Sequence, residues 1–230
     1  MAFKGYSYNK EIVGDSGTGG EGNIQTSGLY PITIERLEFK ETDNPKYDGG
    51  VRQEFVIAYS LKDKKGNLFG LGINNTNGEM NKRTQKIINN LMTILKNTKD
   101  LSEPIKTTIT RQNGDTAEVY HFKEFENKEV IVYIRAKYRQ YQGKIYKDLQ
   151  VIDFFQKDTK ASVDELLNKD PNKYGKRYES MKASKYDLHI DYEGVTEEEA
   201  KQWEEEQKQR RGGQVQQTNS TQDEDDEVPF

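Results

Sequence analysis

The sequence predicts a mainly β domain, a small five-stranded barrel, followed by a C-terminal part that folds poorly. Three observations predict it. Apolar residues alternate as in strands through much of the first 157 of the 230 residues. A single stretch with helical spacing interrupts these strands. Leu, Ile, Val and Phe number 39 in residues 1–157 but only 9 in residues 158–230, a content so low that it is typical of disordered chain.

The first predicted strand changes its apolar face partway along. Tyr30, Ile32 and Ile34 lie on one face, whereas Leu37 and Phe39 lie on the other. A bulge near Glu35-Arg36 reconciles the two halves, and bulges curl strands into barrels.

The other elements follow in a simple order. Strands are expected at 29–40, 51–61 and 68–73, joined by a loop at 41–50 and a turn at Lys64–Asn67; a helix is expected at about 80–97; a hairpin is expected at 107–122 about Asn113-Gly114; and two long strands are expected within 129–155 about Gln142-Gly143.

Three strands, a helix and two strands is the order of an OB-fold barrel, with the hairpin at 107–122 as an insertion. OB-folds bind oligonucleotides across strands 2 and 3 and with loops L12 and L45, which here are residues 41–50 and the turn at Gln142-Gly143. The predicted organisation is an OB-fold nucleic-acid-binding domain at 1–157 with 1–28 partly flexible, a helical or irregular extension at 158–211, and a flexible linker with an acidic tip at 212–230.

Composition excludes several classes of protein. The chain has no cysteine, so disulfides, thiolate zinc sites and cysteine nucleophiles are excluded. It has no apolar run of membrane-spanning length and no secretory signal, so we expect a cytoplasmic protein without membrane contact. The two histidines, His121 and His189, have no metal-ligand spacing, and no catalytic motif is present. We therefore expect no enzyme activity, no metal and no cofactor.

Charge is divided unevenly along the chain. Residues 1–157 carry 24 Lys and Arg against 20 Asp and Glu, whereas residues 191–230 carry 4 against 13. A basic body with an acidic end indicates a site for a polyanion and an interaction tail.

The predicted hairpin at 129–155 is two-sided. A two-residue turn places apolar residues such as Val130, Val132 and Ile134 on one face, where Asp153 is the single misfit. The opposite face carries cations and phenol rings: Tyr133, Arg135, Lys137, Arg139, Tyr141, Lys144 and Tyr146.

This mixture suits a single-stranded nucleic acid. Lys and Arg neutralise phosphates, and tyrosine rings stack on exposed bases with little regard for their identity. Lys46 and Tyr47 in the loop at 41–50 would extend the same track, and Gly70 and Gly72 would either admit a phosphate chain or mark a bend in the barrel. The alternative is an ordinary solvent face, in which Lys137 pairs with Asp148.

Two helices are predicted in the C-terminal part. Ser162 with Glu165 and Thr196 with Glu199 are capping-box patterns, and the second helix has Trp203 as its single bulky apolar residue, with little to bury. The roles of four tyrosines are left open between packing and nucleic-acid contact: Tyr174, Tyr178, Tyr186 and Tyr192.

The chain ends in acids followed by an apolar Val-Pro-Phe. The acids steer this end toward basic surfaces, and Phe230 joins a ring to a free carboxylate. The predicted partner-binding tail is Asp223, Glu224, Asp225, Asp226, Glu227, Val228, Pro229 and Phe230.

This ending resembles the acidic tip of bacterial single-stranded DNA-binding proteins, in which Asp residues precede Ile-Pro-Phe. Joined to an OB-like body, the chain resembles the single-stranded DNA-binding protein of a tailed bacteriophage. The resemblance implies that the protein binds single-stranded DNA, in a bacterial host cytoplasm, during DNA replication, recombination or repair. It also implies that the tip recruits replication and recombination proteins and competes with DNA for the groove. A structural or adaptor protein and an RNA-binding OB protein remain alternatives, and the oligomeric state is open.

Overall fold

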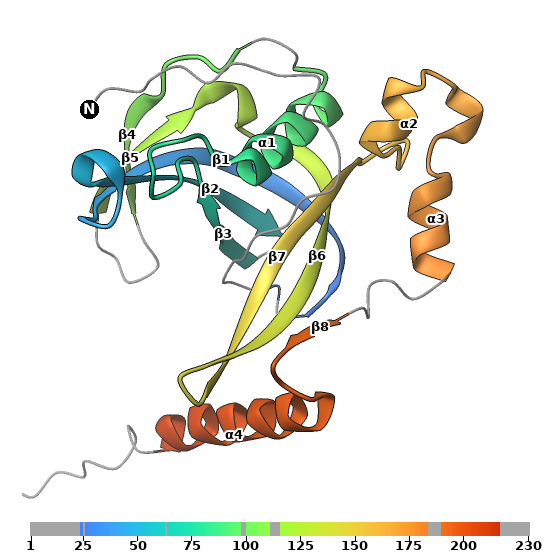
Figure 1. Cartoon of the computed structure of the whole chain (residues 1–230). Coiled ribbons are helices and arrows are strands. Elements are labelled where there is room, and N and C mark those ends of the chain that lie inside the picture. The colour runs from blue at the N-terminus through green and yellow to red at the C-terminus, as the bar shows by residue number, and fades with distance from the viewer. Residues whose placement is uncertain are drawn as a thin grey trace, which may run out of the picture. The chain divides into compact units, whose positions relative to one another are not determined.

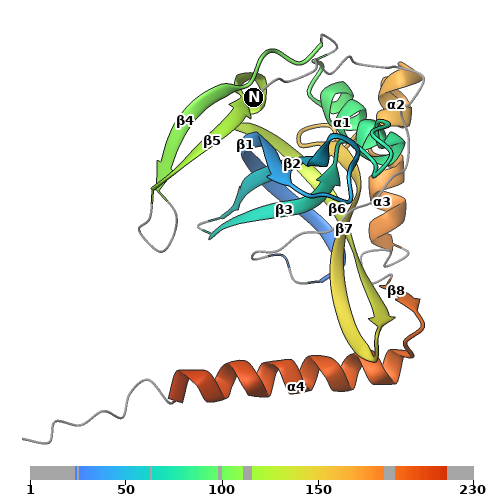
Figure 2. The same ribbon diagram turned by 60° about the vertical axis from the view of Figure 1, so that its left-hand side comes forward.

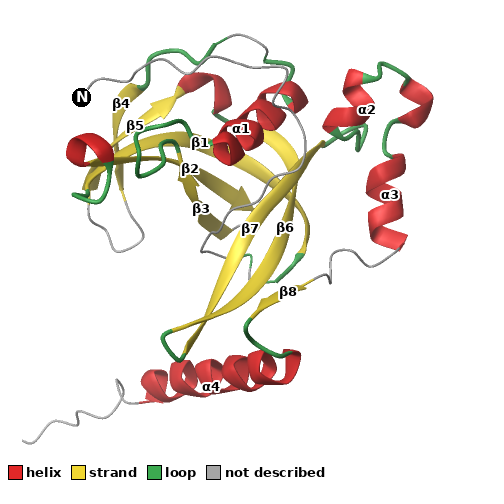
Figure 3. Cartoon of the chain, viewed as in Figure 1, coloured by secondary structure: helices red, strands yellow, loops and turns green. Residues whose placement is uncertain are grey.

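The computed structural model (Figure 1) describes residues 24, 26–62, 64–97, 100–110, 116–183 and 190–216, with the side chains of 208 and 210–216 left aside. These residues form a mainly β structure with an antiparallel sheet and few helices (Figure 3). The strands are β1 (Gly28–Asp43), β2 (Val51–Leu61), β3 (Lys64–Gly72), β4 (Ile105–Thr110), β5 (Thr116–Phe122), β6 (Lys128–Tyr141), β7 (Lys144–Gln156) and β8 (Ile190–Glu193). The helices are α1 (Lys82–Ile94), α2 (Val163–Leu167), α3 (Lys176–Ala183) and α4 (Glu197–Gln216), with short 3-10 turns at Asp48–Gly50, Lys123–Phe125 and Pro171–Lys173.

The chain divides into two compact units. The first comprises residues 1–137 and 148–191, and the second comprises residues 138–147 and 192–230. The hairpin β6–β7 contributes residues to both units, so the division does not follow the predicted boundary after residue 157.

In the first unit, β1 is the strand on which the sheet is built. It pairs antiparallel with β2, β5 and β6. Its register with β2 shifts between Ile34 and Arg36, which confirms the predicted bulge. Because of this shift Ile32, Ile34, Leu37 and Phe39 are all buried.

The predicted turn at Lys64–Asn67 is wrong. These residues belong to β3, where Lys65 pairs with Ser60 and Gly66 with Tyr59. Gly66 is needed for packing, since a Cβ there would lie 2.6 Å from the hydroxyl of buried Tyr59. A glycine that makes room for a ring looks, in sequence, like a turn glycine.

The side chains of β3 do not alternate strictly between two faces. Leu68 and Leu71 are both buried, whereas the alternation of a regular strand would put Leu71 on one face with Phe69 and Leu68 on the other. The register with β2 shifts between Phe55 and Ile57, and Gly70 has a φ of +82°. This irregularity breaks the two-residue alternation on which the prediction depended.

Helix α1 confirms the predicted helical period. Asn81 caps it by accepting hydrogen bonds from the backbone N–H groups of Arg83 and Thr84. Its apolar residues Ile87, Ile88, Leu91 and Met92 are buried.

The misfit Asp153 is explained by partners on two helices. Its side chain is 1% exposed and its Oδ1 accepts a hydrogen bond from Asn90 of α1 at 3.4 Å. Arg177 of α3 forms an ion pair with its Oδ2 at 3.0 Å. The carboxylate therefore joins β7 to α1 and α3 instead of marking a slip in register.

Both predicted capping boxes are confirmed at α2 and α4. Ser162 and Glu165 each bond the other's backbone N–H, as do Thr196 and Glu199. Helix α4 continues to Gln216, so residues 212–216, predicted as flexible linker, are helical. In the part of the chain that the structure describes, no helix is both long enough and apolar enough to cross a membrane.

Candidate nucleic-acid interface

The base of hairpin β6–β7, in the first unit, does not present the predicted surface. Tyr133 is 1% exposed and belongs to a core cluster with Ile131, Phe155 and Met181. Tyr178 of α3 packs on this cluster, with its ring edge-on to Phe155 at 5.7 Å between centroids. The prediction that Tyr133 faces solvent is wrong, because α3 covers this part of the strand.

Arg135, two residues along β6, is half-buried. Its guanidinium carbon lies 5.7 Å from the centre of the Tyr133 ring, and Nη1 lies 3.5 Å from a carboxylate oxygen of Asp191 on β8. Lys137 is also half-buried. These two cations are partly withdrawn from solvent, so the base of the hairpin is a weaker candidate for DNA contact than the sequence predicted.

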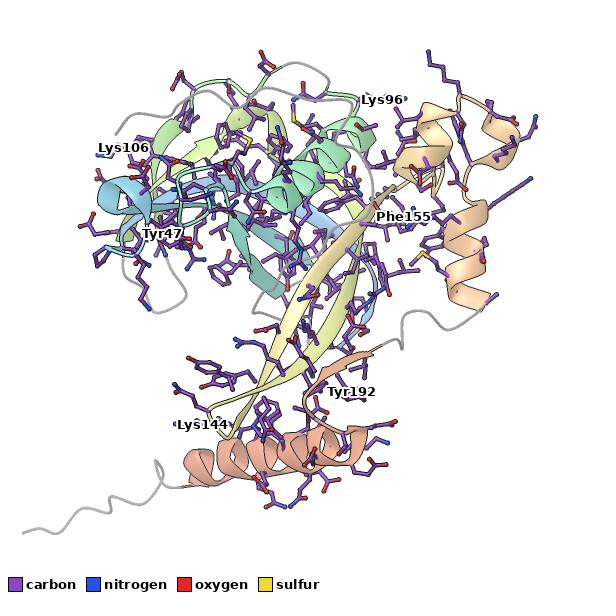
Figure 4. All side chains as sticks on the ribbon, in the orientation of Figure 1. Tyr47, Lys96, Lys106, Lys144, Phe155 and Tyr192 are labelled. Atoms are coloured by element: carbon purple, nitrogen blue, oxygen red, sulfur yellow. The ribbon has the colours of Figure 1, made fainter. Side chains whose placement is uncertain are left out.

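The tip of the hairpin, in the second unit, does present the predicted chemistry. Tyr141 is 57% exposed and Tyr146 is 38% exposed. Arg139 lies over the Tyr146 ring at 5.0 Å, and Lys144 is exposed at the turn (Figure 4). We call these four residues the open face of the tip.

A tight turn holds the open face in place. Gln142 and Gly143 are the two residues between β6 and β7, with φ of 50° and 73°. Positive φ at both positions is what a type I′ turn requires, and this turn matches the twist of the strands. The predicted two-residue turn is thus confirmed, even though its first residue is glutamine.

The other side of the tip is covered by aromatic residues of the second unit. Tyr138 is 3% exposed, stacks on Tyr192 with centroids 5.7 Å apart, and meets Trp203 of α4 edge-on at 6.2 Å. Lys147 Nζ lies 5.4 Å from the centre of the Tyr138 ring. Figure 2 shows α4 beside the turn of the hairpin. We call Tyr138 and Lys147 the covered face of the tip.

Glu204 of α4 completes the covered face. Its Oε1 accepts a hydrogen bond from the Tyr138 hydroxyl at 2.5 Å and also contacts Lys147 Nζ. Burial, followed by this hydrogen bond, raises the pKa of Tyr138 far above its ordinary value. Trp203, the one bulky apolar residue of the predicted helix, therefore packs on Tyr138, a contact that no apolar periodicity predicts.

The first unit contains an open pocket of about 540 Å³ between loop 44–50 and loop 73–81. The pocket is lined by an aromatic ring, a guanidinium group, two glycines and several side-chain amides. These are supplied by Tyr47, Arg52, Gly70, Gly72, Asn74 and Asn81, among others. Lys46, predicted with Tyr47, is exposed but does not line the pocket.

Hydrogen bonds fix the pocket walls. The backbone N–H of Asp48 donates to the carbonyl of Thr76 at 2.8 Å, which joins the two loops. The Asn74 amide accepts from the backbone of Gln53 at 2.9 Å and donates to the carbonyl of Val51 at 3.1 Å. The pocket is thus formed before any ligand arrives, as ligand sites usually are.

Arg52 is held on one side of the pocket. Its Nη2 forms an ion pair with Glu54 at 2.8 Å, and its Nε is buried without a hydrogen-bond acceptor among the described residues. A phosphate or a base edge would supply the missing acceptor only if the side chain shifted to expose Nε.

Several predicted features lie outside the described residues. They are the acidic tail Asp223–Phe230, the turn at Asn113-Gly114, and Tyr186. The sequence leaves the roles of three further tyrosines undecided. Tyr178 and Tyr192 pack against aromatic rings, and Tyr174 is half-buried.

Two further observations frame the site. Over the described ranges, no three His, Asp or Glu side chains gather as a metal ion would require. Comparison with models of known protein families finds no match for this chain, and neither does comparison with curated proteins or with solved structures. The function therefore has to be inferred from the side chains themselves.

Proposed function

We propose that this protein binds single-stranded DNA without sequence specificity and without catalysis. The observation that carries the proposal is the open face of the tip, where Tyr141 and Tyr146 are exposed beside Arg139 and Lys144. Exposed rings that alternate with cations are the combination by which proteins bind single strands, since the rings stack on bases and the cations follow the phosphates.

The chemistry of this face favours an unpaired strand over a duplex. A base stacks on an exposed aromatic ring for roughly 1–3 kcal/mol, and a duplex hides the faces of its bases. Arg139 and Lys144 suit the phosphates that lie between successive bases. Neither contact depends on which base is present, so binding would tolerate any sequence.

The proposal includes an OB-fold for the strands of the first unit. Three strands, α1 and two further strands follow one another, and β1 pairs antiparallel with both β2 and β6. The hairpin β4–β5 is then an insertion, and the pocket with Tyr47 and Arg52 lies by strands 2 and 3 and L12, where OB-folds bind oligonucleotides.

The biological role is part of the same proposal. Single-stranded DNA would be coated and protected during bacteriophage replication, recombination or repair, in the bacterial host cytoplasm. The acidic tail at 223–230 would recruit replication and recombination proteins and compete with DNA for the cations. This part is supported by the resemblance of the DEDDEVPF ending alone.

The test is a titration of the full chain with oligo-dT. We expect Tyr141→Ala and Tyr146→Ala each to weaken binding by roughly 1–3 kcal/mol, because each removes a stacking ring. The matched controls are Tyr141→Phe and Tyr146→Phe, which keep the ring and should keep the affinity. Affinity should also fall steeply with salt.

Two results would contradict the proposal. An absence of binding to oligo-dT by the wild-type chain would favour the structural or adaptor alternative. Equal affinity of the Ala and Phe variants would place the site elsewhere. A matched RNA oligomer that outcompetes DNA would instead favour the RNA-binding alternative.

A further inference from the structure

The two faces of the hairpin tip have the same chemistry. On the open face a guanidinium, Arg139, lies 5.0 Å from the ring of Tyr146. On the covered face an ammonium, Lys147, lies 5.4 Å from the ring of Tyr138. Each face therefore offers a cation and a phenol ring side by side, but on the covered face Tyr192 of β8 stacks on the ring and Trp203 of α4 meets it edge-on.

Helix α4 contacts the covered face without the apolar stripe by which an amphipathic helix usually packs. A packed helix presents an apolar stripe, whereas among the side chains described for α4 the buried or partly buried apolar ones are Ala200 and Trp203. The remaining hold is polar, since Glu204 contacts both the Tyr138 hydroxyl and Lys147. The contact is partly buried, since the side chains of Lys147 and Glu204 are 17% and 32% exposed, so a competing anion would replace Glu204 only if it also neutralised Lys147.

The residues that α4 places on the covered face match a nucleotide in chemistry. Trp203 brings a planar bicyclic ring edge-on to Tyr138, with an interplanar angle of 83°, and Glu204, the next residue, brings an anion against Lys147. We infer that the covered face is a second contact for single-stranded DNA, and that α4 occupies it as an internal substitute, with the Trp203 ring in the place of a base and the Glu204 carboxylate in the place of a phosphate. This inference rests on the proposed function.

The charge of α4 supports the exchange. The helix carries six Glu against four Lys and Arg, a net charge of −2, and three of these Glu, at 197–199, lie in its first turn. A single strand brings a continuous series of phosphates and releases its counterions when Lys147 neutralises one of them. The strand would therefore displace α4 and engage the tip on both faces.

The test compares two isosteric variants of the full chain that remove the same charge. Glu204→Gln loses the anion that contacts Lys147, whereas Glu205→Gln loses an exposed neighbouring anion. We expect Glu204→Gln to bind oligo-dT about three- to tenfold more tightly than Glu205→Gln, and Lys147→Gln in the Glu204→Gln background to remove this gain. In the wild-type chain, emission of Trp203, the only tryptophan, should shift to longer wavelength as DNA releases its ring into water.

The outcomes separate this inference from the proposed function. Wild-type binding that depends on Tyr141, with equal affinity for the two Gln variants and no shift of Trp203 emission, overturns the inference and leaves the function standing. Weaker binding by Glu204→Gln than by Glu205→Gln also overturns it, because α4 would then support the open face. If Glu204→Gln binds oligo-dT and the other chains do not, the inference is supported. If no chain binds oligo-dT, both the inference and the proposed function are overturned. Unfolding curves of each variant verify that the second unit stays folded.

Discussion

The two ends of hairpin β6–β7 share one sequence pattern and differ in environment. At the base, Tyr133 precedes Arg135 and is 1% exposed; at the tip, Arg139 precedes Tyr141, which is 57% exposed. Alternation along a strand determines which side chains share a face, but it does not determine what later segments of the chain place on that face. The same tyrosine–cation pattern can therefore serve a core at one end and a surface at the other.

The base of the hairpin is covered by side chains from α3. Met181 joins Tyr133 in the core cluster, and Tyr178 lies on it with the ammonium groups of Lys160 and Lys182 at 5.9 and 5.6 Å from its ring. The rings at the base should therefore contribute to the stability of the fold, whereas those on the open face of the tip should contribute to binding.

The largest expected effect separates these two roles. Tyr133→Ala should lower the free energy of unfolding by about 3–5 kcal/mol, because it leaves a cavity in the core cluster. Tyr141→Ala should change it by less than about 0.5 kcal/mol, because its ring is exposed. Urea unfolding of both variants measures the difference. A stable Tyr133→Ala chain with impaired DNA binding would instead restore Tyr133 to the interface.

A second prediction concerns the cations. Arg177→Leu should lower the free energy of unfolding by about 2 kcal/mol, since it leaves the buried carboxylate of Asp153 without its ion pair. The control is Lys176→Leu, which removes an exposed charge from the preceding residue and should have little effect. Equal unfolding midpoints for the two variants would show that Asp153 does not depend on Arg177. Neither change should alter the affinity of the tip for oligo-dT.

Much of the local structure of both units could be predicted from the sequence. The bounds of β2, the bulge after Ile34, the helical period of α1 and the turn at Gln142-Gly143 all follow from local patterns. These patterns are strong because each repeats over many residues or depends on a local backbone requirement. The capping boxes belong to the same group, since both partners lie within four residues of each other.

The candidate site was only half predictable. The contacts that cover Tyr133 and Tyr138 come from Met181, Tyr178 and Trp203, which are single residues in segments of low apolar content. Contacts made by single residues produce no periodic pattern in the sequence. Sequence analysis therefore places Tyr133 on the solvent face and gives Tyr138 no role. The pocket with Arg52 was missed for a related reason, because it depends on Asn74 binding the backbone of β2 across 21 residues of sequence.

The smallest expected effect concerns the segment that covers the base. The Glu165 carboxylate accepts hydrogen bonds from the backbone N–H groups of Ser162, Gly175 and Arg177, and so joins α2 to α3. Burial alone would raise the pKa of Glu165, but these hydrogen bonds outweigh it and lower the pKa below its ordinary value of 4.5.

A lowered pKa in the folded state fixes the sign of the pH dependence. The stabilisation by Glu165 should be complete above about pH 4.5 and should be lost as the pH falls through the folded-state pKa, because the protonated group accepts these hydrogen bonds less well. Amide hydrogen exchange of residues 162–183 as a function of pH, corrected for intrinsic exchange, measures this loss. Glu165→Gln should show weaker protection at pH 7 and a smaller change between pH 5 and pH 3. If the wild type and this variant respond alike to acid, the cover over Tyr133 is held by the Met181 and Tyr178 contacts alone, and the base of the hairpin stays covered at any pH at which the sheet is folded.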